Sequence, residues 1–229
     1  MQLTERYRSV NDRIAASCSA AGRAVSDVEL VVVTKNHSAE VVAELYDLGH
    51  RQFGENRDQE AGPKAEALAA GGRLDAKWHF VGQLQSNKVR TVLNYATCIH
   101  SIDRSSLVKE LAKQLGNREL EIEGFIELNL TEDPARGGVE PSNLQQLAHS
   151  VMEIGRIKLL GVMAVAGLGV DPRIDFDKTL LASQELQKIA PEANQLSMGM
   201  SEDFELAIEM GATHIRVGSA ITGPRPNNT

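Results

Sequence analysis

The sequence predicts an α/β protein, a (β/α)8 TIM barrel with one extra helix at its N-terminus. Eight short apolar runs alternate with helical patterns, no long linker interrupts them, and the composition does not shift along the 229 residues. Eight strands are the number that closes this barrel, and such barrels often exceed 200 residues as one unit. We therefore expect a single domain over residues 1–229. A doubly wound open sheet is the alternative that the alternation leaves open.

An amphipathic helix is predicted ahead of the first strand. Its apolar positions recur at intervals of three and four residues: Leu3, Tyr7, Val10, Ile14 and Cys18. This spacing places one apolar stripe along a helix, which ends at the turn region of Ala21 and Gly22.

Eight apolar runs follow and are interpreted as parallel strands. They are VELVVVT (28–34), QFGEN (52–56), WHFVG (78–82), TCIHSI (97–102), GFIELNL (124–130), KLLGVMAV (158–165), QLSMGM (195–200) and HIRVGSAI (214–221). Strands buried on both faces have this nearly continuous apolar character.

Helix signals lie between the runs. Ser38 occupies a cap position and Gly49 a stop position, and Pro141 opens another helical stretch. Further apolar positions at helical spacing are Val41, Leu45 and Leu48, then Leu107, Leu111 and Leu115 before Gly116, and then Leu144, Leu147, Val151 and Ile154. These signals support the alternation of strands with helices.

Composition limits the function classes. The formal net charge is −7 and the isoelectric point is about 5.4, which argues against a general binder of nucleic acid or anionic membranes. No apolar run approaches the length of a membrane span, and the first residues do not resemble a secretory leader. Cys18 and Cys98 lack the spacing of a zinc site. We expect a cytoplasmic protein whose two thiols are reduced and buried.

Lys35 is the first candidate for chemistry. Working residues of a barrel lie at the C-terminal ends of its strands, and Lys35 directly follows the first apolar run. Partial desolvation there would favour the neutral amine that a Schiff base requires. Judged alone, an ordinary surface lysine in a strand-to-helix loop is the commoner interpretation.

The last two strand ends suggest an anion site. Ser201 is predicted to be the N-cap of the helix after the seventh strand, and Gly218 and Ser219 close the eighth. Phosphate-binding barrels often hold their ligand with these two loops. Glu202 and Asp203, in the predicted first helical turn, allow the alternative that this helix is simply well capped.

Arg216 is predicted to lie inside the barrel, where its guanidinium needs an acceptor. Either a carboxylate such as Glu127 or a ligand would supply it. The segment GLGVDP (167–172) lacks the third glycine and the helix start of a dinucleotide fingerprint, so a loop is expected. The six histidines lack the spacing of a zinc helix, and hydrolase elbows and Walker loops are missing from the sequence. The sequence therefore predicts neither a metal site nor a catalytic triad.

Together these segments resemble the pyridoxal phosphate homeostasis proteins, barrels that bind pyridoxal 5′-phosphate (PLP). These proteins are related to the N-terminal domain of alanine racemase, which has PLP fold type III. The motifs that carry the resemblance are VTKN around Lys35, FGENRDQE (53–60), WHFVGQLQSNK (78–88), HSID (100–103), GVM of the sixth strand, SMGMSEDFELAIEMGATHIRVGSAITG (197–223) and Arg225. They cover nearly the whole chain, in order.

The resemblance implies a role for each candidate. Lys35 would form the internal aldimine, Ser201 with Gly218 and Ser219 would hold the phosphate, and Arg216 would face the pyridine nitrogen. Asn56 would be a neighbour of the cofactor. The implied function is non-catalytic: PLP is stored, buffered or delivered to PLP-dependent apoenzymes in vitamin B6 homeostasis.

Two residues depart from the family pattern. Thr222 stands where an aromatic residue is expected, and Arg136 where many relatives have lysine. Both put the packing of the barrel mouth in question.

Two other functions remain open. A fold-type III enzyme such as an amino-acid racemase would need a further β-domain, and only TGPRPNNT follows the eighth run. The same observation favours a monomer. A barrel that binds another phosphorylated metabolite without Schiff-base chemistry is the third possibility.

Overall fold

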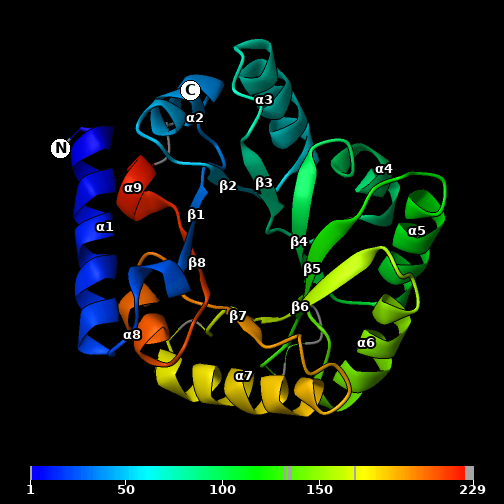
Figure 1. Cartoon of the computed structure of the whole chain (residues 1–229). Helices are drawn as coiled ribbons and strands as arrows, with labels where there is room; N and C mark the ends of the chain where they lie inside the picture. Colours follow the sequence, from blue (N-terminus) through cyan, green and yellow to red (C-terminus); the bar gives the residue numbers. More distant parts are fainter. Residues whose placement is uncertain (1, 132, 134–135, 168, 225–229) are drawn as a thin grey trace.

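Eight parallel strands close into one barrel in a computed structural model that describes residues 2–131, 133, 136–167 and 169–224. The strands are β1 (Glu29–Val33), β2 (Gln52–Glu55), β3 (Lys77–Phe80), β4 (Ala96–Ile102), β5 (Ile122–Glu127), β6 (Ile157–Met163), β7 (Gln195–Ser197) and β8 (His214–Val217). Each strand pairs with the next, and β8 pairs with β1, so that Val32 lies opposite Val217 (Figure 1). The barrel prediction is confirmed, and the open doubly wound sheet is excluded.

Helices surround the barrel. They are α1 (Leu3–Ala20), α2 (Ala39–Asp47), α3 (Asp58–Ala70), α4 (Val89–Val92), α5 (Ser105–Leu115), α6 (Leu144–Met152), α7 (Pro172–Gln187), α8 (Phe204–Glu209) and α9 (Ser219–Thr222). Ser38 is the N-cap residue of α2, and Gly49, just beyond its end, has a φ of 96°. Pro141 opens a short 3₁₀ turn that leads into α6. The predicted helix limits are therefore confirmed at these positions.

The predicted strands run too long at their C-terminal ends. The last run was expected to continue to residue 221, but β8 ends at Val217 and α9 begins at Ser219. The seventh run was expected to reach residue 200, but β7 ends at Ser197. The apolar run is longer than β7 because it includes Met198, which is fully buried although it lies just beyond the strand. Burial extends the apolar pattern into the loops that form the mouth.

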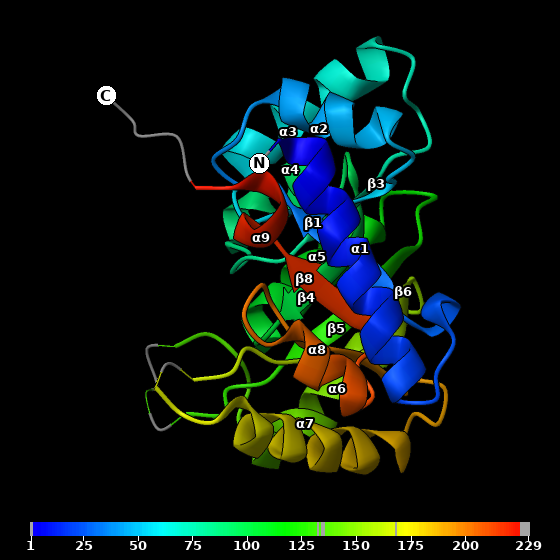
Figure 2. The same ribbon diagram turned by 90° about the vertical axis from the view of Figure 1, so that its left-hand side faces the viewer.

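The extra N-terminal helix is confirmed. Leu3, Val10, Ile14 and Cys18 are buried, and α1 packs against α8 and α9 (Figure 2). The helix after β8 has only four residues, so α1 covers this side of the barrel in its place. Arg6 of α1 donates a hydrogen bond from Nε to the carbonyl of Ile221, 2.6 Å away.

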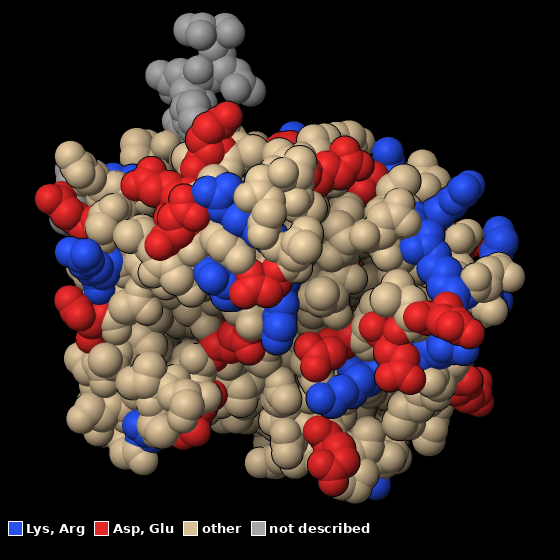
Figure 3. Space-filling model, turned by 45° about the horizontal axis from the view of Figure 1, so that its top comes forward, with Lys and Arg blue, Asp and Glu red and all other residues tan. Residues whose placement is uncertain are grey.

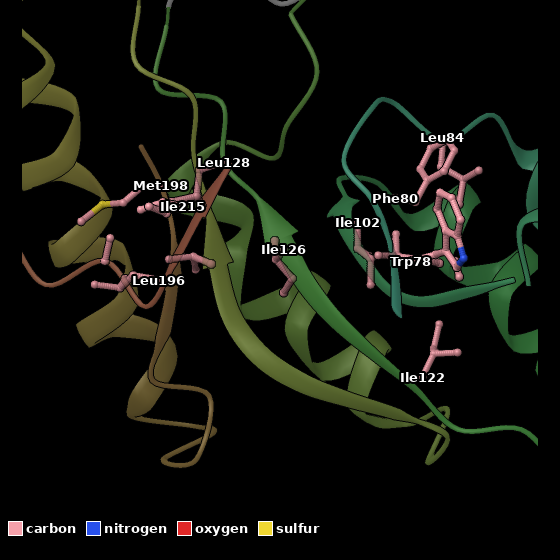
Figure 4. Close-up of a cluster of buried hydrophobic side chains, with 14 of the residues drawn as sticks. Trp78, Phe80, Leu84, Ile102, Ile122, Ile126, Leu128, Leu196, Met198 and Ile215 are labelled. Carbon is pink, nitrogen blue, oxygen red and sulfur yellow. The ribbon is translucent and has the colours of Figure 1, made fainter. Parts of the chain in front are cut away.

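The core has two parts. The larger part fills the layer between strands and helices; Figure 4 shows Trp78, Phe80 and Leu84 in one region of it. The smaller part lies among strands β4, β5 and β6 and consists of Cys98, Phe125, Leu160 and Met163. Polar side chains share this inner region, since the rings of His100 and His214 each lie within 5.0 Å of the Phe125 ring.

The surface carries charges of both signs. Figure 3 shows acidic and basic side chains interspersed over one face of the molecule. Of the helices in the described part of the chain, none combines the length and apolarity that crossing a bilayer requires. Cys18 and Cys98 are free thiols and both are buried, as expected.

The loop after β6 requires one correction. A helix start was judged missing from GLGVDP, but α7 begins at Pro172, directly after Asp171 as its N-cap. The side chain of Asp171 accepts a hydrogen bond from the backbone N–H of Arg173. The backbone N–H of Gly167 donates to Asp175 in the first turn of α7, 2.8 Å away. This N–H is thus used within the protein, in keeping with a structural loop.

Candidate functional site at the mouth of the barrel

The predicted site residues lie at one end of the barrel. Lys35 follows β1 by two residues, and Asn56 directly follows β2. Gly218 and Ser219 directly follow β8, and Ser201 lies four residues beyond β7. Because β7, β8, β1 and β2 are consecutive neighbours in the sheet, these positions share the C-terminal edge of four adjacent strands. The sheet therefore brings the segment of Lys35 to the same end of the barrel as that of Ser219, 184 residues later in the chain.

Lys35 sits in a tight turn between β1 and α2. The backbone N–H of His37 donates to the carbonyl of Thr34 at 3.1 Å, which closes the turn. Asn36 adopts a left-handed backbone with φ of 63°, a conformation that asparagine tolerates better than most residues. Lys35 itself is half-buried. This turn directs the chain from the barrel wall to the outer helix.

A buried ion pair between α3 and β2 holds the same turn in place. Lys64 of α3 donates from Nζ to Glu55 Oε1 at 2.6 Å and to the carbonyl of Thr34 at 2.9 Å. The hydroxyl of Thr34 also donates to Glu55 Oε1, at 2.6 Å. Glu60, one helical turn before Lys64, accepts from the backbone N–H of Asn36 at 2.7 Å. Residues on both sides of Lys35 are thus fixed by β2 and α3.

Ser201 has a different role from the one predicted. The N-cap residue of α8 is Asp203, whose carboxylate accepts from the backbone N–H of Met200 at 2.5 Å. Ser201 therefore does not cap α8. Its Oγ instead accepts from the backbone N–H groups of Gly218 and Ala220, at 3.2 and 3.4 Å. The hydroxyl lies at the start of α9, in contact with Gly218, one of the two residues that were expected to act with it.

Gly218 approaches the end of β1 closely. A Cβ atom at this position would lie 3.3 Å from the carbonyl oxygen of Val33, tighter than ordinary van der Waals contact. Ser219, the next residue, is the first of α9. The glycine thus allows the β8–α9 connection to pack against the strand that precedes Lys35.

Arg216 lies inside the barrel, as predicted, and finds its acceptors within the protein. In the part of the chain that the structure describes, these acceptors are Ser197 Oγ, 2.5 Å from Nη1, and the carbonyl of Ala164, 2.9 Å from Nη2. Burial lowers the pKa of Arg216 to about 10, and the guanidinium remains charged at neutral pH. Two nitrogens of the guanidinium are thus already hydrogen-bonded within the protein.

Glu127 was the expected ion-pair partner and acts on Arg216 only through its charge. Burial and, to a smaller extent, the nearby Asp103 raise the pKa of Glu127 to about 7, although Arg216 acts to lower it. A carboxyl group at the end of β5 is therefore close to half ionised at neutral pH. The sequence did not predict this property.

Asn56 lies beside a cavity that the sequence did not predict. Its Oδ1 atom is buried and has no hydrogen-bond partner among the described residues. The cavity has a volume of about 550 Å³ and lies at the ends of β2 and β3; Arg57, Gln83 and Lys88 also line it. Gly82 permits the close fit, since a Cβ atom there would lie 2.5 Å from the carbonyl oxygen of Asn56.

Both departures from the family pattern have structural partners. Thr222 is buried, and its hydroxyl donates to the carbonyl of Gly218 at 3.2 Å. Arg136 donates to the carbonyls of Val165 and Ala166, which ties the β5–α6 loop to the end of β6. Arg225 lies outside the described residues.

Comparison with known proteins identifies the family. The family model named alanine racemase, N-terminal domain, matches residues 11–226. A pyridoxal phosphate homeostasis protein of Aquifex aeolicus is 39% identical over 229 residues, which cover 98% of this chain and 99% of the relative. The chain belongs to the pyridoxal phosphate homeostasis protein family. The Escherichia coli K12 member is 34% identical, with 97% of each chain covered.

Solved structures agree with this assignment. PipY of Synechococcus elongatus, in a structure described as having PLP bound, has a TM-score of 0.84 and 33% identity to this family member, covering 97% of this chain and all of PipY. The alanine racemase of Corynebacterium glutamicum has a TM-score of 0.63 at 17% identity. The match covers 94% of this chain but 61% of that racemase. The racemase therefore supports the barrel fold alone.

Proposed function

We propose that this homeostasis family member holds PLP covalently on Lys35 and stores, buffers or delivers it. The observation that carries the proposal is that Lys35, Asn56, Ser201, Gly218 and Ser219 follow the C-terminal ends of four adjacent strands, with Ser201 hydrogen-bonded to Gly218. The PipY structure with PLP bound, in a relative 33% identical, supports the choice of ligand.

The residues at the mouth fit such a cofactor. Asn56 has a buried oxygen that lacks a partner in the described chain, an unsatisfied polar atom of the kind that calls for a partner. Ser201 and Ser219 contribute hydroxyls beside the backbone amides of Gly218 and Ala220. Hydroxyls and amides are the donors that phosphate groups use in barrels of this kind. We assign these two serines and Gly218 to the phosphate.

When bound, PLP supplies an aldehyde that condenses with an amine and a ring that accepts negative charge. Lys35 provides the amine. Arg216 holds a positive charge within the barrel, and this charge opposes protonation of a ring nitrogen placed against it. A site of this type binds the cofactor while weakening its use as an electron sink.

We therefore propose that the protein is not an enzyme and that PLP-dependent apoenzymes are its partners. The names of the relatives support this, since they describe homeostasis rather than a reaction. We also propose a cytoplasmic monomer without nucleic-acid partners; two free, buried thiols and the net charge of −7 are consistent with it.

Substitution of Lys35 tests the covalent link. Lys35→Ala should remove the imine absorbance that PLP gives with the wild-type chain, while the circular dichroism spectrum stays unchanged. Lys88→Ala is the matched control, because Lys88 lines the neighbouring cavity and should keep the absorbance. Borohydride reduction followed by peptide mapping should label Lys35. A label on Lys88 or on any other lysine contradicts the assignment.

A racemase remains the second candidate because racemases share the fold and because Glu127 has a pKa of about 7 at the mouth. We expect racemisation, transamination and decarboxylation of common L-amino acids to be absent or far below enzyme rates. Chiral chromatography of amino acids incubated with the PLP-loaded protein measures this. Turnover above roughly 1 s⁻¹, the lower end of ordinary enzyme rates, would show that the protein is an enzyme.

A further inference from the structure

Five polar side chains inside the barrel are joined end to end. Arg216 Nη1 lies 2.5 Å from Ser197 Oγ, and Ser197 Oγ lies 2.8 Å from His100 Nδ1. His100 Nε2 lies 2.9 Å from His79 Nδ1, and His79 Nε2 lies 2.8 Å from Gln52 Oε1. The five residues come from β8, β7, β4, β3 and β2, so the series crosses the barrel interior.

One direction satisfies every side chain of the series. Gln52 Oε1 can only accept, so a neutral His79 donates to it from Nε2 and accepts through Nδ1. A guanidinium has donors but no acceptor, so Ser197 Oγ must accept from Arg216. The Ser197 hydroxyl then has its own proton to donate, and His100 Nδ1 is positioned to accept it. His100 must therefore carry its proton on Nε2 and donate to His79 Nδ1. His79 in turn carries its proton on Nε2 and donates to Gln52.

The geometry points to one oriented hydrogen-bond chain, from Arg216 through Ser197, His100 and His79 to Gln52, that fixes both histidines as Nε2–H tautomers and holds the guanidinium in place. Ser197 is the positioning residue, because its hydroxyl is the link between the arginine and the rings. The role of Ser197 in PLP binding rests on the proposed function, whereas the hydrogen-bond chain does not.

The surroundings favour neutral rings throughout. His79 and His100 are buried, and burial is the main cause that lowers the pKa of His79 to about 3 and of His100 well below its usual value. His214 lies within 6.4 Å of both rings, and burial and Arg216 lower its pKa to about 4. Neutral histidines can accept and donate at once, whereas a protonated ring could not accept from Ser197.

A metal site is the competing interpretation of the same histidines. His79, Cys98 and His100 each offer one ligand atom, and these atoms lie within 4.8 Å of one another. Two imidazoles and a thiol suit zinc. However, all four ring nitrogens already take part in the hydrogen bonds of the chain. Metal binding would break at least one link, so the two interpretations exclude each other.

Nitrogen NMR of the full-length protein tests the chain without PLP. With ¹⁵N-labelled histidine, His79 and His100 should each show a protonated Nε2 and an unprotonated Nδ1, unchanged between pH 5.5 and 8.5. A protonated Nδ1 on either residue, or titration in this range, would overturn the chain. Loss of both Nε2–H signals on addition of one equivalent of zinc chloride would overturn it in favour of the metal site.

Substitutions then test the role of Ser197. Ser197→Ala should release His100 into a mixture of tautomers and weaken PLP binding about tenfold or more, because a buried guanidinium loses an acceptor. Ser197→Thr keeps the hydroxyl and should restore the single tautomer. Ser101→Ala is the matched control: Ser101 is buried on β4 and its Oγ has no hydrogen-bond partner in the described chain.

The two outcomes can be told apart. If the wild-type protein shows His79 and His100 each as the Nε2–H tautomer but binds no PLP, the proposed function fails and the hydrogen-bond chain stands. If Ser197→Ala leaves the His100 tautomer and PLP affinity unchanged, Ser197 does not position Arg216 and the inference fails. Equal effects of Ser197→Ala and Ser101→Ala on PLP affinity would also show that Ser197 does not position Arg216.

Discussion

At the scale of single residues, the buried charges near the mouth decide how the site is held. Lys64 and Glu55 are almost fully enclosed, with exposed side-chain fractions of 7% and 1%. Burial raises the pKa of Glu55, and Lys64 lowers it in compensation. Such a pair is costly to build, and removal of one partner leaves the other as an uncompensated charge. In this protein the pair also holds the Lys35 turn, because Lys64 donates to the carbonyl of Thr34, the residue before Lys35.

Loss of Lys64 should therefore destabilise the protein and loosen the Lys35 turn. We expect Lys64→Met to lower the free energy of unfolding by roughly 3–5 kcal/mol, the range for breaking buried pairs. Urea denaturation measures this. Lys113→Met is the control, because Lys113 pairs with Glu110 while 70% exposed and should change stability by less than about 1 kcal/mol. Equal effects of the two substitutions would contradict the anchoring role of Lys64.

Glu127 should make stability depend on pH. Its pKa in the folded protein is about 7, above the ordinary value of 4.5, so the folded state binds its proton more tightly than the unfolded state. Its contribution to stability is full below pH 4.5 and is lost as the pH rises through 7.

Glu127→Gln removes this dependence. Relative to wild type, the variant should gain roughly 2–3 kcal/mol of unfolding free energy between pH 4.5 and pH 8. Urea denaturation of the PLP-free protein across this range measures the difference, with Glu123→Gln, an exposed carboxylate of the same strand, as control. A constant difference between Glu127→Gln and wild type would show that Glu127 has an ordinary pKa.

At the scale of elements, local signals predicted where helices and strands begin better than where strands end. Ser38, Gly49 and the leucines of α5 act through contacts within a few residues, and each was placed correctly. Ser201 was misassigned because Asp203, two residues later, is also a capping residue and takes the N-cap of α8. The partner of Ser201 is Gly218, 17 residues away, and only the sheet brings them together.

The connection between Ser201 and α9 can be tested by substitution. Ser201→Ala together with Ser219→Ala should weaken PLP retention at least tenfold, because two hydroxyl donors are lost from the proposed phosphate site. Equilibrium dialysis against PLP measures retention. Ser150→Ala on α6 is the control, since its hydroxyl bonds only within that helix. Unchanged retention in the double variant would place the phosphate elsewhere.

At the scale of the whole molecule, the sequence predicted the barrel because a closed parallel sheet repeats one simple pattern eight times. It also placed Lys35, Asn56, Gly218 and Arg216 at or near strand ends, where the structure has them. The sequence did not predict the hydrogen-bond chain from Arg216 to Gln52. His79 and His100 were tested for the spacing of a zinc helix, yet they lie on neighbouring strands and meet through the sheet. A signal existed: WHF and CIHSI each place one histidine within a buried strand.

The exposed apolar surface bears on oligomeric state. Six large apolar side chains are exposed in the described part of the chain; two of them, Ile174 and Leu181, lie on α7, and Val170 lies just before it. Ile174 and Leu181 lie two helical turns apart and share a face. Three side chains cannot supply the roughly 800 Å² that each partner of a stable dimer buries. These side chains alone are therefore too few to form a stable dimer interface.

Light scattering coupled to size-exclusion chromatography should give a mass near 24.9 kDa at concentrations up to about 100 μM, the mass of one chain. Leu181→Glu provides the control, because it places a charge at the more exposed of the two apolar side chains on α7 and should leave this mass unchanged. A wild-type mass near twice this value that falls to one chain in Leu181→Glu would show that α7 is a dimer interface. This measurement therefore decides whether the mouth of the barrel functions in a single chain or in a pair.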